Sequence, residues 1–186
     1  MTSTLQTSAT PGVDVPADTP LAPERQDLLE TLAKHRFFLK LTARELTDEQ
    51  ANTRSTVSAL TVGGIIKHVT EVERNWADFI LNGPAVTRFD EADWNATDWE
   101  AGFRLLPGET LEGVVAAYDE AARRTDELVR TVDLDASQPL PVAPWFEPGK
   151  HWTARRVLLH VVAETAQHAG HADIIRETID GQKSMG

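Results

Sequence analysis

The sequence predicts an all-α protein folded as a four-helix bundle with long irregular connections. Apolar residues recur at helical spacing in four long segments, and capping residues or glycines bound these segments. No segment alternates apolar and polar residues in the manner of a half-buried strand. With 186 residues the chain is expected to form one domain, residues 21–186, preceded by a disordered tail at residues 1–20 that is poor in large apolar side chains.

The first expected helix begins at Pro23, because proline suits a first helical turn, and continues to about Leu46. One stripe of this helix carries Leu28, Leu32, His35 and Leu39. The residues that follow, Thr47–Gln50, have the pattern of a capping box, which predicts a further short helical turn.

The second expected helix begins near Thr61 and ends at Asn82–Pro84, where a glycine and a proline stop it. Its buried stripe, with His68 beside it, is expected to contain Ile65, Val69, Val72 and Trp76. Residues 83–108 then form a long, acidic and irregular connection. We expect three of its aromatic residues to anchor the connection on the bundle: Trp94, Trp99 and Phe103.

The third and fourth helices each open at a threonine, and Thr110 is expected to be the N-cap of the third. The third is expected from Thr110 to about Arg130, and the fourth from Thr153 to Asp180–Gly181, where the glycine ends it. A proline-rich loop over residues 139–149 separates these two helices. Together the four segments are sufficient to surround one core.

Composition excludes several classes of function. The 18 Lys and Arg residues against 29 Asp and Glu residues give a net charge of −11 without a basic cluster, so we expect no nucleic-acid partner. No apolar run reaches the roughly 20 residues of a membrane span. The first basic residue is Arg25, so we expect the N-terminus to lack the charged and apolar regions of a signal peptide. We therefore expect a cytoplasmic protein without a membrane partner. Because the sequence contains 0 cysteines, any metal must be held by histidine and carboxylate.

Histidines and a carboxylate interrupt the apolar faces of the second and fourth helices. Each of them alone is more often a hydrogen-bonded core residue, but Glu164 and His168 stand one turn apart on the core side and can share a divalent ion. A buried carboxylate without a partner is costly, and a cation compensates it. With His68 from the second helix, the set has three ligands and an open position for water or substrate. We expect Zn²⁺ for this nitrogen-rich set, with Ni²⁺, Fe²⁺ or Mn²⁺ as alternatives.

The remaining histidines have other expected roles. His171 lies on the same side of the helix as the two ligands, and we expect it to face the cleft as a catalytic group rather than to be a fourth ligand. Gly170 beside it is expected to allow close approach of another helix. His160, one turn before the first ligand, is expected to be structural or to support the ligands. His35 is a less favoured ligand candidate, and His151 is expected to face solvent.

Three segments carry a family resemblance: Leu60–Val69, Glu71–Trp76 and Leu158–Gly181. They resemble the DinB-like superfamily of four-helix metalloproteins, and within it the mini-circle-protein branch. The resemblance spans about residues 24–181, and its last segment is the most specific. It implies the same three metal ligands, and their order of His, Glu and His is similar to the pattern of mycothiol-dependent maleylpyruvate isomerase.

The resemblance implies a thiol-dependent transferase or isomerase. In such an enzyme the ion binds the sulfur of a low-molecular-weight thiol such as mycothiol or bacillithiol, which then loses its proton near neutral pH. That thiol supplies the nucleophile which a cysteine-free chain lacks, and it attacks a small electrophile. We therefore predict a metal-dependent S-transferase with a thiol and an electrophile as partners, acting as a monomer or a homodimer. Two alternatives stay open: a non-enzymatic divalent-metal-binding module of stress response, and a metal-dependent hydrolase whose ion activates water.

Overall fold

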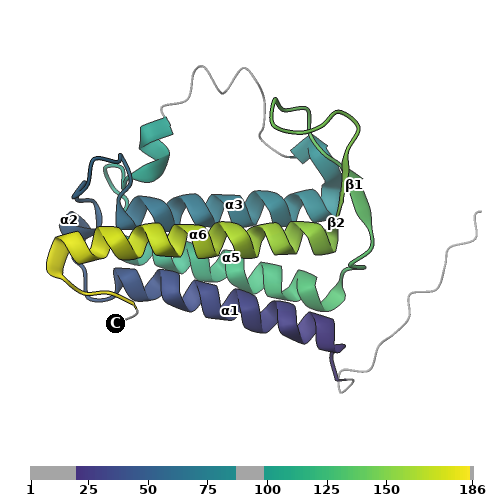
Figure 1. Cartoon of the computed structure of the whole chain (residues 1–186), viewed down its shortest axis with the longest axis horizontal. Helices are drawn as coiled ribbons and strands as arrows, with labels where there is room; N and C mark the ends of the chain where they lie inside the picture. The colour runs from purple at the N-terminus through teal and green to yellow at the C-terminus, as the bar shows by residue number, and fades with distance from the viewer. Residues whose placement is uncertain (1–19, 87–98, 185–186) are drawn as a thin grey trace, which may run out of the picture.

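Four long helices form the body of the molecule (Figure 1). The computed structural model describes residues 20–86 and 99–184. Its long helices are α1 (Pro23–Ala43), α3 (Val62–Asn82), α5 (Leu111–Thr131) and α6 (Ala154–Asp180). Its short elements are α2 (Asp48–Ala51), the 3-10 turns η1 (Gly83–Val86) and η2 (Trp99–Phe103), and the strands β1 (Ser137–Pro139) and β2 (His151–Thr153). The expected all-α four-helix bundle is confirmed.

The four helices pack around a shared interior. Helix α3 lies against both α5 and α6, and α1 closes the bundle mainly against α6 (Figure 1). The turn η2 lies against α3, so the long connection returns to the bundle there before α5 begins. Within residues 20–86 and 99–184, no helix combines the length and the apolar character needed to cross a membrane.

The helix ends follow the expected capping signals. Thr61, Thr110 and Thr153 each accept a hydrogen bond from the backbone N–H three residues later. The expected N-cap at Thr110 is confirmed, and Thr61 and Thr153 cap α3 and α6 in the same way. Helices α3 and α6 end at Gly83 and Gly181, with φ of 71° and 79°. Glycine adopts these positive φ values without the steric cost that a Cβ atom brings.

Helix α1 ends earlier than expected, at Ala43 rather than near Leu46. Glu45 has a φ of 63°, in the left-handed region, and a residue in that conformation cannot continue a right-handed helix. The chain therefore turns before the predicted capping box of Thr47 and Gln50, which is confirmed at the start of α2.

A short antiparallel hairpin was not expected from the sequence. Strands β1 and β2 pair with Ser137 opposite Thr153 and Pro139 opposite His151. Each strand has 3 residues, too few to produce an alternating pattern of apolar and polar side chains. The expectation that no strand would form was therefore wrong for this segment, which carries the proline-rich loop and leads directly into α6.

The core consists of two apolar clusters at opposite ends of the bundle. One includes Leu39, Val62, Ile65, Ile66, Val69, Leu111, Tyr118 and Ile175. The other includes Leu32, Trp76, Phe79, Val129, Val157 and Leu158. Both clusters draw on all four long helices, so burial of these side chains holds the helices in one bundle.

A buried ion pair lies between the two clusters. Arg36 of α1 and Glu73 of α3 are 5% and 0% exposed, and the guanidinium contacts both carboxylate oxygens of Glu73. Nη1 of Arg36 also donates to Oδ1 of Asp126 on α5 at 2.7 Å. The buried stripe of α1 thus contains Arg36 in place of the expected His35, which is only half-buried. This polar layer joins three helices near the middle of the bundle.

Candidate metal centre

Helices α3 and α6 bring together the three residues expected to bind a metal. His68, Glu164 and His168 each offer one ligand atom, and these atoms lie within 4.8 Å of one another. Nε2 of His168 is 3.6 Å from Oε2 of Glu164, and the ring centroids of His68 and His168 are 4.8 Å apart. All three side chains are half-buried. Glu164 and His168 converge because they stand one helical turn apart, whereas His68 depends on the packing of α3 against α6.

The protonation states at this cluster suit metal binding. Burial lowers the pKa of His68 to about 4, helped by the neighbouring His168, so its imidazole is neutral at pH 7. Contact with His168 is the largest cause that lowers the pKa of Glu164, so its carboxylate is ionised. A neutral imidazole nitrogen and a carboxylate oxygen are ligands that Zn²⁺ and similar ions accept without first displacing a proton.

Unsatisfied polar atoms at the cluster also fit a bound cation. Among the described residues, the ion-pair contacts of Glu164 are with His160 and His168, and Lys or Arg supplies none. Nδ1 of His168 is buried without a hydrogen-bond partner in the same part of the chain. A half-buried carboxylate without a basic partner is stabilised by a divalent ion. The residues present therefore fit a metal that takes nitrogen and oxygen ligands.

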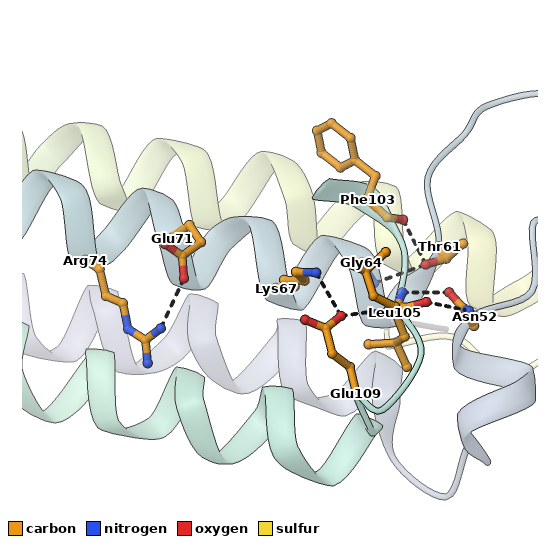
Figure 2. A network of polar contacts seen from close by, with 10 residues as sticks. Asn52, Thr61, Gly64, Lys67, Glu71, Arg74, Phe103, Leu105 and Glu109 are labelled. Atoms are coloured by element: carbon orange, nitrogen blue, oxygen red, sulfur yellow. Dashed lines mark hydrogen bonds and ion pairs between the residues drawn. The ribbon is translucent and has the colours of Figure 1, made fainter. Parts of the chain in front are cut away.

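The long connection supplies one wall of the cluster. The ring of Phe103 packs on the ring of His68, with centroids 4.7 Å apart. The backbone N–H and the hydroxyl of Thr61 donate to the Phe103 carbonyl at 3.3 and 3.0 Å. Figure 2 shows the next anchor, where the amide side chain of Asn52 exchanges two hydrogen bonds with the backbone of Leu105. Phe103 thus has the expected anchoring role.

A salt bridge completes this anchoring on the other side of α3. Nζ of Lys67 lies 2.8 Å from Oε2 of Glu109, just before α5 begins (Figure 2). The same carboxylate accepts the backbone N–H of Leu106 at 2.8 Å. Of the other two expected anchors, Trp99 belongs to η2 and Trp94 lies outside the described residues.

His171 lies next to the cluster without belonging to it. Its ring centroid is 5.4 Å from that of His168, and its Nδ1 atom is buried without a hydrogen-bond partner among the described residues. Its ligand atoms do not join the group that lies within 4.8 Å. The arrangement leaves a half-buried imidazole available beside the cluster.

The other histidines lie in three different surroundings. His160 places Nε2 at 3.7 Å from Oε1 of Glu164, on the opposite side from His168. His35 on α1 lies outside the donor group, and His151 in β2 is exposed as expected.

The aromatic residues around His160 could not be assigned from the sequence. The ring of His160 lies 5.1 Å from that of Trp76 and 5.2 Å from that of Trp152, measured between centroids. Trp152 reaches this position only because the unexpected hairpin folds back beside α6. The sequence shows only that Trp152 precedes the capping Thr153, and this does not indicate that its ring contacts His160.

Comparison with known proteins assigns the family. The sequence matches the family described as Mycothiol-S-transferase over residues 27–181, most of the chain. The chain belongs to this family. The mycothiol-S-transferase match covers the three long segments that carry the DinB-like resemblance, and it includes both helices of the candidate metal centre. A search of curated proteins gave no match.

A solved structure shares the fold of this mycothiol-S-transferase family member. It is described as a conserved protein from Enterococcus faecalis, and it superposes with a TM-score of 0.63 at 15% sequence identity. The alignment covers 84% of this chain and 97% of that chain. At this level of identity the likeness concerns the fold alone. The likeness therefore supports the fold of the four-helix bundle.

Proposed function

We propose that the protein is a metal-dependent S-transferase that joins a low-molecular-weight thiol of the mycothiol type to a small electrophile. The family match supports the transfer of a thiol. The observation that carries the metal dependence is the convergence of ligand atoms from His68, Glu164 and His168 within 4.8 Å. The chain contains 0 cysteines, so the nucleophilic sulfur has to come from a second molecule.

The three ligands leave room for a substrate. A divalent ion held by three protein groups commonly keeps a further position for an exchangeable ligand. When bound, the ion would take up the thiol sulfur and lower the pKa of the thiol toward neutrality. Zn²⁺ is our first choice because two of the three ligand atoms are imidazole nitrogens, and Ni²⁺, Fe²⁺ and Mn²⁺ accept similar sets.

The side chains around the cluster have distinct tasks in this proposal. His171 hydrogen-bonds the thiol or accepts its proton, since its ring lies beside that of His168, with centroids 5.4 Å apart. The S–H bond breaks, a bond forms between sulfur and the electrophilic carbon, and the leaving group departs with its electron pair. The ring of Phe103 on His68 limits access of water to that ligand.

A paired measurement of metal content and thiol-dependent turnover tests the proposal. Protein purified without a histidine tag is expected to contain close to one metal ion per chain, and the triple alanine variant of His68, Glu164 and His168 is expected to contain none. The metal-loaded protein is then incubated with mycothiol, bacillithiol or glutathione and an electrophile such as monobromobimane or chlorodinitrobenzene. Turnover above background with at least one thiol, lost in the triple variant, is the expected result.

Other outcomes would favour the two alternatives. Equal metal content in wild type and triple variant would rule out the proposed ligands. Metal binding without turnover for any of these pairs would favour a metal-binding module. Hydrolysis of an ester or amide without thiol would favour a hydrolase, in which the bound ion activates water.

A further inference from the structure

Glu164 has a histidine on each side along α6. His160, Glu164 and His168 follow one another at intervals of one helical turn on the same face. Nε2 of His168 is 3.6 Å from Oε2 of Glu164, and Nε2 of His160 is 3.7 Å from Oε1. The two carboxylate oxygens therefore face different histidines.

His160 lies outside the group of ligand atoms. That group consists of His68, Glu164 and His168 among the described residues, although His160 is as near to Glu164 as His168 is. His160 thus contacts the carboxylate from the side facing away from the other two ligands. This position suits a residue that holds the carboxylate, and it does not suit a fourth ligand.

Two tryptophans fix the ring of His160. Trp76 and Trp152 stack on each other with centroids 5.0 Å apart, and each presents an edge-on contact to His160. Trp76 is only 4% exposed, so the bundle core holds it in place. An imidazole packed against the edge of this stacked pair has few rotamers to choose from, which reduces the entropy cost of a directed hydrogen bond.

We propose that His160 is a positioning residue that donates a hydrogen bond from Nε2 to Oε1 of Glu164, so that Oε2 stays directed at the metal site. The inference rests on the proposed metal function. Glu164 needs such support, because its side chain is 26% exposed and its torsions are free to rotate toward solvent. The 3.7 Å separation is longer than a hydrogen bond, and a small rotation of the carboxylate closes it when an ion fixes Oε2.

Metal affinity tests this role more directly than activity does. His160→Phe keeps a ring against the stacked tryptophans and removes the donor, whereas His160→Gln keeps a donor. Apoprotein is titrated with Zn²⁺ against a competing chelating dye, and the visible spectrum of the Co²⁺ form is recorded. We expect His160→Phe to bind one ion per chain about 10- to 100-fold more weakly, as removal of a group that supports a metal ligand typically does. His160→Gln is expected to recover most of the affinity.

The matched control replaces a histidine away from the site. His151→Phe makes the same substitution at an exposed position in β2 and is expected to keep wild-type affinity. Wild-type affinity and spectrum in His160→Phe would overturn the positioning role while leaving the metal site intact. Loss of the bound ion in His160→Phe, matching the loss in His168→Ala, would make His160 a ligand and would also overturn it.

A measurement on wild-type protein covers the case in which His160→Phe does not fold. Long-range ¹H–¹⁵N spectra of the Zn²⁺-loaded protein report the protonation of each imidazole nitrogen. We expect a proton on Nε2 of His160, and a metal-bound or unprotonated Nε2 would overturn the inference. A wild-type protein that binds no metal would instead remove the proposed function, and the positioning role with it.

Discussion

The carbonyl oxygen of Phe103 occupies the space that a side chain on Gly64 would need (Figure 2). A Cβ atom on Gly64 would lie 1.8 Å from this oxygen and 2.4 Å from the backbone nitrogen of Arg104. Both atoms belong to the backbone, so rotation of a side chain cannot relieve the clash. Glycine at this position lets the connection lie directly on α3, and this brings the Phe103 ring onto His68.

Gly64→Ala is therefore expected to destabilise the protein and to disturb the cluster. Alanine is favoured over glycine by about 1 kcal/mol in a helix interior, but forcing the connection away from α3 costs about 1–3 kcal/mol or more, as overpacking does. Unfolding in urea measures the change in free energy, and a Zn²⁺ titration measures the change in affinity. The control is Gly170→Ala, where no described atom lies within 4 Å of the added Cβ, and we expect it to be neutral or stabilising. Equal effects of the two substitutions would contradict this account.

Loss of stability at mildly acidic pH is expected in the metal-free protein. The pKa of His68 falls from 6.5 to about 4 because the ring is buried, so the unfolded chain binds a proton at higher pH than the native state does. The contribution of His68 to stability is then constant above pH 7, declines as the pH falls from about 6.5 to about 4, and changes in total by about 3 kcal/mol. Urea unfolding with EDTA between pH 7.5 and pH 4.5 follows this change. His68→Gln is expected to flatten the slope, and parallel slopes in variant and wild type would argue against the cause.

Removing one partner of the buried ion pair is expected to destabilise the protein more than removing both partners. Glu73→Leu leaves the Arg36 guanidinium buried with only the partly exposed Asp126, which costs about 3–5 kcal/mol. The double variant Arg36→Met with Glu73→Leu is expected to regain most of this free energy. Thermal and urea unfolding of the single and double variants give the comparison. A double variant less stable than Glu73→Leu would show that the pair itself stabilises the bundle.

Local signals explain what the sequence could predict. Capping threonines and terminal glycines act within one turn, so the ends of α3, α5 and α6 follow from a few neighbouring residues. The pairing of Glu164 with His168 is local in the same way, because it needs only helical spacing. His68 was added to the set as a ligand from a partner helix, and the family resemblance implied the same choice, but its approach to the other two depends on how two helices pack.

Features that depend on distant contacts were not predictable. Arg36 is buried because Glu73 and Asp126 meet it from other helices, and an isolated stripe of α1 favoured His35 instead. Trp152 meets His160 through a hairpin whose strands are too short to leave a pattern. Gly170 was expected to allow close helix approach, but it is exposed and no described atom lies within 4 Å of a Cβ placed there. Helical spacing alone does not show which face of a helix packs against another element.

A pair of matched substitutions distinguishes the role of His171 from that of the metal ligands. His171→Gln is expected to keep metal content and Zn²⁺ affinity near wild type, because its ligand atoms lie outside the group formed by His68, Glu164 and His168. Turnover with the active thiol is expected to fall by about 10²- to 10⁴-fold if His171 accepts the thiol proton, and the pH dependence of kcat is expected to change. His168→Gln is the control and is expected to deplete the metal. Depletion of equal size in His171→Gln would make it a ligand, and unchanged kinetics with full metal content would make it structural.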